Sequence, residues 1–264
     1  MLAIALVGVL FCQDPEPAPQ PGPAPKSGQE TGQEPNASQS SSSKKLETWS
    51  DKDAGAKIKA FEKALKLKQA SMPVRKEALD ELAGGINRQL IKPLQQFIEK
   101  ESSVVLKKQA VEMLADQPKE RARPAILKLL NNARVTGNPQ VHAGLIAALS
   151  KSGYKDDDWK VIGELLESDY DPERVPVHEA VLALVTQHKE AQALAMLLRN
   201  LDEPNPKDVH GGANPPAEYW KARWHSWAVW KGRVKDALFA VTGQRFITAD
   251  EAKAWLKKNP IKSK

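Results

Sequence analysis

Two apolar patterns recur along this chain at nearly constant intervals, and they constrain its fold more than any other feature. The first places large apolar residues at positions 0, +3 and +4, in Leu94/Phe97/Ile98, Ile126/Leu129/Leu130, Ile162/Leu165/Leu166 and Leu194/Leu197/Leu198. The second places small or aliphatic residues at positions 0, +1 and +4, in Ala78/Leu79/Leu82, Ala110/Val111/Leu114, Leu145/Ile146/Leu149 and Ala180/Val181/Leu184. Both patterns recur every 32 to 36 residues. Because steps of three and four residues share one face of an α-helix, the chain is predicted to form four helical hairpins.

Helical periodicity continues through most of the chain after residue 46, and it predicts an all-α fold. The expected helices cover residues 50–69, 73–85, 93–100, 102–116, 119–132, 138–151, 156–167, 175–188 and 189–200. Helix-breaking residues such as Pro118, Gly137 and Gly153 separate them. No segment alternates apolar and polar residues for long enough to predict a strand.

Each expected hairpin has an apolar stripe on both of its helices, so it needs neighbours that cover them. Stacking the hairpins in chain order buries the stripes in one continuous core, which is the arrangement of an α-solenoid. The sequence therefore predicts a right-handed α-solenoid, with repeats over about 73–201. A helical bundle without repeats remains the alternative, because its amphipathic helices would carry the same local spacing.

Two segments resemble a known family of repeat proteins. Residues 105–130, VLKKQAVEMLADQPKERARPAILKLL, resemble a HEAT-type repeat, with small and aliphatic residues in the first helix and leucines in the second. Residues 237–259 are similar to the closing segment of exported bacterial HEAT-like proteins of uncharacterised function, in which a Leu-Thr-Gly-Gln-x-Phe turn precedes a helix that bears tryptophan. This chain departs from that pattern at Val241, which replaces the leucine, and at Leu256, which stands where a second tryptophan is common. The resemblance implies a repeat architecture and a role in interactions, rather than one particular activity.

The first 45 residues differ in composition from the rest of the chain. An apolar run at 2–11 is too short to span a bilayer and is typical of a secretory signal, which we assign to residues 1–12. Seven prolines and a serine run predict a disordered linker over 13–45. The protein is therefore expected to be exported, that is, secreted or periplasmic. The charged start of a typical signal is missing, so an upstream start stays open, and bulky Phe11 disfavours a lipid anchor on Cys12.

A Trp-rich region over 217–264 is expected to cap the repeat domain, which spans 46–264. Gly243 is free to adopt the left-handed conformation that ends many helices. Thr248 is followed three residues later by a glutamate, which is the spacing of a capping box at the start of a helix. The last helix would then cover the open end of the stack with apolar residues that include Trp255.

Positive charge is concentrated near the C-terminus. Residues 221–264 contain eleven Lys or Arg and three Asp or Glu, a net charge of +8, whereas the whole chain carries +6. Five of the seven tryptophans lie between 220 and 255, and basic residues interleaved with aromatic ones can bind nucleic acid or another polyanion. In the alternative interpretation the tryptophans pack inward and only the basic residues face solvent. The candidate partner-binding residues are Arg223, Trp224, Trp227, Trp230 and Lys231, together with His210 in the long interruption at 202–216.

Motifs for enzymatic chemistry are missing or incomplete. The sequence has no GxSxG nucleophile elbow, no Walker A loop and no dinucleotide-binding fingerprint. His178 and Glu179 begin like a zinc-protease motif, but Leu182 stands where the second histidine ligand belongs. The single cysteine cannot build a disulfide framework or a cysteine-rich zinc site. We therefore expect a protein that is not an enzyme and has neither a cofactor nor a metal site.

Two functions follow as expectations. The first is a non-enzymatic, monomeric scaffold of the cell envelope or exterior that binds protein partners of unknown identity. It would have no membrane span, because no stretch after the signal approaches the ~20 apolar residues that a spanning helix needs. The alternative is a basic HEAT-like protein that binds DNA or another polyanion, or that acts as a DNA glycosylase.

Overall fold

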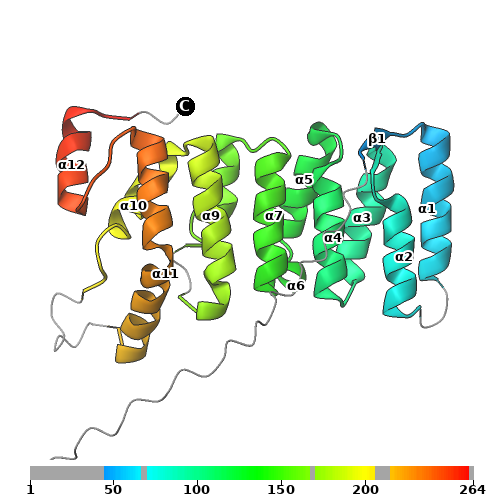
Figure 1. The fold of residues 1–264 in the computed structure, drawn as a ribbon, viewed down its shortest axis with the longest axis horizontal. Coiled ribbons are helices and arrows are strands. Elements are labelled where there is room, and N and C mark those ends of the chain that lie inside the picture. Colours follow the sequence, from blue (N-terminus) through cyan, green and yellow to red (C-terminus); the bar gives the residue numbers. More distant parts are fainter. Residues whose placement is uncertain (1–44, 67–69, 167–169, 206–214, 262–264) are drawn as a thin grey trace, which may run out of the picture. The chain divides into compact units, whose positions relative to one another are not determined.

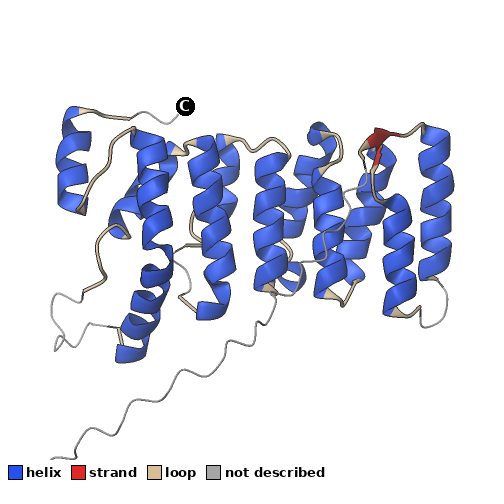
Figure 2. Ribbon diagram, viewed as in Figure 1, coloured by secondary structure: helices blue, strands red, loops and turns tan. Residues whose placement is uncertain are grey.

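The computed structural model describes residues 45–66, 70–166, 170–205 and 215–261. The predicted signal, nearly all of the predicted linker and the candidate residue His210 lie outside this part of the chain. Within it the fold is all-α, as predicted, because helices make up almost all of the regular structure (Figure 2). None of the described helices is long and apolar enough to cross a membrane.

Twelve α-helices, four short 3₁₀ helices and two very short strands follow one another along the described residues. The α-helices are α1 (Asp51–Leu65), α2 (Met72–Leu82), α3 (Ile91–Lys100), α4 (Val104–Ala115), α5 (Lys119–Leu130), α6 (Ala133–Thr136), α7 (Pro139–Lys151), α8 (Trp159–Ile162), α9 (Val175–His188), α10 (Leu194–Arg199), α11 (Ala217–Thr242) and α12 (Ala249–Lys258). The 3₁₀ helices are η1 (Arg88–Leu90), η2 (Asp156–Asp158), η3 (Pro172–Arg174) and η4 (Ala191–Ala193), and the strands are β1 (Glu47–Thr48) and β2 (Gly85–Ile86).

Several helices begin where a side chain satisfies backbone N–H groups that have no partner inside the helix. The Ser50 hydroxyl accepts a hydrogen bond from the N–H of Asp53 at the start of α1, at 3.1 Å. The Asn138 side chain accepts two at the start of α7, from the N–H groups of Gln140 and Val141, both at 3.1 Å. These local signals explain why the predicted helix starts are close to the observed ones.

The helices pack in the order in which they occur along the chain (Figure 1). Helices α4, α7, α9 and α11 lie side by side, each in contact with the next. The intervening helices pack against this row, since α3 contacts α4 and α5, and α10 contacts α11 and α12. At the N-terminal end of the described unit, α1 packs against α2. The main contacts between described helices therefore join elements that are close in chain order.

The two predicted apolar patterns form the core of the described unit. All but four of their residues are buried, and the four exceptions are half-buried and pack against the same core: Leu165, Ala180, Leu194 and Leu198. The patterns therefore mark the side chains that hold neighbouring helices together, as predicted.

A short pair of strands was not predicted from the sequence. β1 and β2 form a parallel pair in which Glu47 lies opposite Gly85 and Thr48 lies opposite Ile86. The Trp49 ring covers Gly85 so closely that a Cβ atom there would lie 2.4 Å from a ring carbon. Because Gly85 has no side chain, the segment before α1 can pair with the turn after α2. The prediction of a chain without strands is therefore wrong at this point.

The predicted helix over 156–167 is also wrong in part, because it is replaced by η2 and the four-residue α8. The Asp158 carboxylate is buried there and has partners on two elements. Its Oδ2 accepts hydrogen bonds from Arg123 Nε of α5, at 2.8 Å, and from the backbone N–H of Lys155, at 2.9 Å. This ion pair with Arg123 connects the tight turn at η2 to the preceding helix pair.

The predicted end of α11 and start of α12 are confirmed. Gly243 has a left-handed backbone, with φ of 74°, and its N–H donates to the carbonyl of Phe239 at 2.8 Å. The Thr248 hydroxyl accepts from the N–H of Glu251 at 3.2 Å, as a helix cap does. The carboxylate of Glu251 accepts from the N–H of Ile247, at 2.8 Å, instead of from Thr248. The second hydrogen bond of the capping box is therefore made with the N–H of the residue before the N-cap, instead of with that of the N-cap residue itself.

Candidate functional site

The predicted partner-binding residues near the C-terminus lie within residues 223–231 of α11, but the helix does not present them all to solvent. Trp224 is 49% exposed and Lys231 is exposed. Arg223 and Trp227 are half-buried, and Trp230 is fully buried. The predicted set therefore divides into surface, intermediate and core positions.

Trp230 is a core residue that holds α11 against α9. Its ring centroid lies 4.6 Å from that of His178 and 6.1 Å from that of Tyr170. Ser226, one turn earlier on the same side of α11, is also buried and donates a hydrogen bond to the Tyr170 carbonyl at 3.1 Å. A fully buried indole cannot contact a partner, so the prediction that Trp230 belongs to a binding surface is wrong.

Two basic side chains of α11 stack on aromatic rings. The Arg223 guanidinium carbon lies 5.6 Å from the centre of the Tyr170 ring and 5.7 Å from that of Trp220. The Lys231 ammonium nitrogen lies 4.9 Å from the centre of the Trp227 ring. Cation–π contacts hold a cation in place without neutralising its charge. The basic and aromatic residues that are interleaved in the sequence of α11 are therefore also in contact with one another in the structure.

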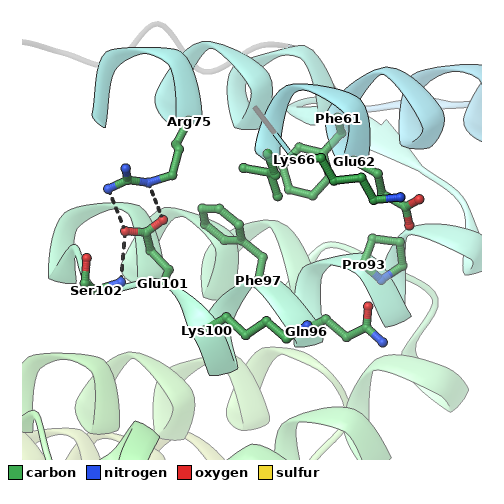
Figure 3. A pocket seen from close by; sticks show the side chains of 11 residues that line it. Phe61, Glu62, Lys66, Arg75, Pro93, Gln96, Phe97, Lys100, Glu101 and Ser102 are labelled. Carbon is green, nitrogen blue, oxygen red and sulfur yellow. Dashed lines mark hydrogen bonds and ion pairs between the residues drawn. The ribbon is translucent and has the colours of Figure 1, made fainter. Parts of the chain in front are cut away.

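A pocket that was not predicted from the sequence lies near the other end of the described unit, between α1, α2 and α3 (Figure 3). Its volume of about 530 Å³ is in the range of pockets that take small ligands or side chains. The floor is apolar and consists of the buried rings of Phe61 and Phe97, 5.6 Å apart, with Leu65 and Pro93 beside them. These residues come from two separate helices, so no local motif reveals the pocket.

One wall of the pocket is an ion pair with all of its polar atoms engaged (Figure 3). Arg75 donates from Nε and Nη2 to the two carboxylate oxygens of Glu101, at 2.9 and 3.1 Å, and from Nη1 to the carbonyl of Ala70. Glu101 also accepts from the N–H groups of Ser102, at 3.0 Å, and Ser103, at 2.8 Å.

The surroundings of Glu101 keep its carboxylate ionised. Burial alone would raise the pKa of Glu101, but the hydrogen bonds from Arg75 and Ser103 outweigh burial and hold the pKa below its ordinary value. Both charged groups of the wall are already paired, so the wall offers no free acid or base for catalysis. It is instead a rigid boundary of the pocket.

The rim of the pocket is polar and exposed. Lys66 follows the last residue of α1 and Lys100 ends α3, where a positive charge offsets the negative end of a helix dipole. Glu62 and Gln96 complete the rim (Figure 3). An apolar floor inside a polar rim is typical of a pocket that takes an apolar side chain of a protein partner.

Ser150 and His188 approach each other like a nucleophile and its base, with 2.9 Å between Oγ and Nε2. The Ser150 hydroxyl, however, is buried and donates its only proton to Gln187 at 2.8 Å. Close by, Tyr154 donates to Glu190 at 2.5 Å, and burial together with this bond raises the pKa of Tyr154. These bonds join the C-terminal ends of α7 and α9, so we interpret the pair as structural.

The incomplete zinc-protease motif on α9 is part of the packing between helices. His178 is buried against Trp230, and Glu179 forms an ion pair with Arg233 of α11 at 3.1 Å. In the part of the chain that the structure describes, no three His, Cys, Asp or Glu residues lie close enough together to hold a metal ion.

Neither a protein-family model, nor a curated protein, nor a solved structure matches this chain significantly. The resemblance of residues 105–130 and 237–259 to HEAT-like proteins therefore rests on the sequence alone. A function for this chain has to be argued from its geometry.

Proposed function

We propose that this protein is an exported, non-enzymatic scaffold that binds another protein through a right-handed α-solenoid of HEAT-like hairpins. In this arrangement four successive hairpins consist of α2 with α3, α4 with α5, α7 with α8, and α9 with α10, and α11 with α12 caps the last one. Two observations support the proposal: the spacing of the bonds between hairpins and the pocket beside α3.

The spacing of long-range hydrogen bonds supports a stack of repeats. Several side-chain bonds join residues that are about one repeat apart: Gln117 to Gly85 (32 residues), Arg123 to Asp158 (35), Tyr154 to Glu190 (36) and Ser150 to Gln187 (37). These separations are close to the 32 to 36 residues between successive apolar patterns. A bond that spans one repeat connects a hairpin to the next one, as expected of a stack in which each repeat contacts only its neighbours.

The pocket is the single observation that carries the binding of a protein partner. An apolar side chain placed on the rings of Phe61 and Phe97 would leave water and become a central anchor of an interface. The paired Arg75 and Glu101 fix one wall before any partner arrives, so that little reorganisation is needed on binding.

A substitution at the rim tests this pocket without altering the core. Gln96→Trp places an indole at the mouth of the pocket, whereas Lys128→Trp places the same side chain on α5, away from it. Gln96 and Lys128 are both exposed, so neither change disturbs buried packing.

Full-length protein with either substitution is used to capture and crosslink proteins from cell-envelope extracts, over a range of concentrations. We expect a saturable partner that binds the wild type and Lys128→Trp equally. Gln96→Trp should bind it at least about tenfold more weakly, a loss of about 1.4 kcal/mol. No saturable partner, or equal binding by Gln96→Trp, would contradict the proposal.

The net charge of +8 over residues 221–264 favours a second function, the binding of DNA or another polyanion. A glycosylase would also need a carboxylate and aromatic rings around a pocket deep enough for an extruded base. Trp224 donates to Glu203, but both side chains are exposed and do not enclose such a pocket. The affinity for duplex DNA, measured at increasing salt concentration, tests this function. A steep fall in affinity with salt would support polyanion binding, and no binding at low salt would contradict it.

A further inference from the structure

The solvent-facing side of α11 carries a continuous series of basic and apolar side chains. Residues at steps of three or four lie on one face of an α-helix. In α11 such a series, here called the outer face, consists of Lys221, Trp224, Ala228, Lys231, Lys235 and Phe239. All of its members are exposed except the half-buried Ala228, and Trp224 and Phe239 are 49% and 41% exposed.

The outer face is turned away from α9 and α10. The opposite side of α11 carries Ser226, Trp230 and Ala237, which are buried, and α11 packs against α9 and α10. Helix α11 is the last member of the row that also contains α4, α7 and α9 (Figure 1). Figure 1 shows α12 beyond α11 at this end of the molecule, where it packs against α10, and the residues of the outer face remain exposed or half-buried.

The charges on the outer face are not neutralised. Lys221, Lys231 and Lys235 form no ion pair with any residue that the structure describes. The ion pair that α11 does form, between Arg233 and Glu179, connects it to α9. The two acidic residues of α11 fall outside the series. One carboxylate does lie on this face, because Glu203 accepts the hydrogen bond from Trp224. Three lysines against one glutamate still give the outer face a net positive charge.

The turn after α11 adds another basic residue and another exposed apolar residue beside the outer face. The guanidinium carbon of Arg245 lies 4.6 Å from the centre of the Phe239 ring, so the turn returns to the outer face. Two residues later, Ile247 is 80% exposed. Exposed apolar tips at Trp224, Phe239 and Ile247 are therefore interspersed with unpaired cations.

We propose that the outer face of α11 docks this protein onto an anionic lipid surface, an interaction separate from the binding of a protein at the pocket. Cations attract lipid phosphates, and exposed Trp, Phe and Ile side chains enter the boundary between headgroups and acyl chains. A second copy of the chain would meet its own positive charge there. Nucleic acid fits this face less well, because Ile247 has no ring on which a base can stack.

Co-sedimentation of the full-length protein with lipid vesicles tests this proposal. Vesicles of phosphatidylcholine mixed with phosphatidylglycerol supply the anionic surface. Pure phosphatidylcholine vesicles show how much lipid binding comes from the apolar run at 2–11, which all variants share. The test variant is Lys231→Gln/Lys235→Gln. The matched control, Lys59→Gln/Lys63→Gln, removes two charges at the same spacing from exposed positions of α1.

We expect the wild type to sediment with the anionic vesicles and to be released by salt, because salt screens the attraction. One lysine near an anionic leaflet contributes about fivefold to partitioning, so the test variant should bind about 25-fold more weakly while the control binds like the wild type. Trp224→Ala should also weaken binding without changing its salt dependence.

Three results would overturn the proposal. The first is no sedimentation with anionic vesicles at low salt. The second is an equal loss in the test and control variants, which would show that net charge alone matters. The third is tighter binding of the wild type to duplex DNA than to anionic vesicles, with that binding lost in the Lys231→Gln/Lys235→Gln variant, which would assign the outer face to nucleic acid.

Discussion

Single buried polar residues specify which helices pack together. The Gln117 side chain donates to the carbonyls of Gly85 and Met113 and accepts from the N–H of Asn87. A buried polar group without a partner costs about 1–3 kcal/mol, so such a residue is stable only where all of its partners are present. Apolar stripes alone are compatible with several ways of stacking the helices, whereas the hydrogen bonds of Gln117 form in only one of them.

His142 gives the stability of the fold a dependence on pH. Its side chain is buried, and burial, followed by the nearby charge of Arg174, lowers the pKa of His142 to about 4. In the unfolded chain the imidazole has an ordinary pKa of 6.5, so the unfolded state binds more protons between these two values. The free energy of unfolding should therefore fall as the pH is lowered through this window, by about 3 kcal/mol from this residue.

Urea denaturation of the wild type and of His142→Gln, at several values between about pH 4 and 7, measures this effect. Glutamine does not titrate, so the variant should lose less stability than the wild type as the pH falls. The same pH dependence in both proteins would contradict a buried, neutral His142.

At the scale of helices, local sequence signals were sufficient to predict the bounds of those helices whose apolar spacing and starting residues lie within one segment. Helices α4, α5, α7 and α9 lie within two residues of their predicted bounds. Elements that depend on distant contacts were not predictable. The pairing of β1 with β2 needs Gly85 beneath Trp49, and the wall of the pocket needs Arg75 beside Glu101, 26 residues away.

The candidate site was predicted in part for the same reason. The basic and aromatic composition of α11 is a local signal that picked out the candidate residues, of which the structure exposes Trp224 and Lys231. Which side of α11 is buried depends on α9, where His178 contacts the Trp230 ring. The sequence alone therefore could not separate Trp230, which belongs to the core, from its exposed neighbours.

The N-terminal cap of α12 makes a testable contribution to that helix. Thr248→Ala removes the oxygen that accepts a hydrogen bond from the N–H of Glu251, a change that typically costs about 1 kcal/mol. Because α12 is the last described helix, amide hydrogen exchange should become faster in α12 and stay unchanged in α4. Thr248→Ser keeps the oxygen and should exchange like the wild type. Unchanged exchange in Thr248→Ala would show that the cap adds no stability.

At the scale of the whole molecule, the proposed solenoid and a helical bundle without repeats differ in how they distribute stability. In a solenoid each hairpin is stabilised by its neighbours, so loosening one end leaves the other end folded. In a small bundle that unfolds in one cooperative step, a core defect lowers the stability of every helix. The central claim, that the hairpins stack in a line, therefore has a consequence that hydrogen exchange can measure.

Hydrogen exchange in Leu197→Ala, resolved along the chain, is the most direct test. Leu197 is fully buried in α10, and its truncation should cost about 2–5 kcal/mol locally. The solenoid predicts that amide protection falls in α9 to α12 and is retained in α2 to α5. An equal loss of protection in every helix from α2 to α12 would contradict it.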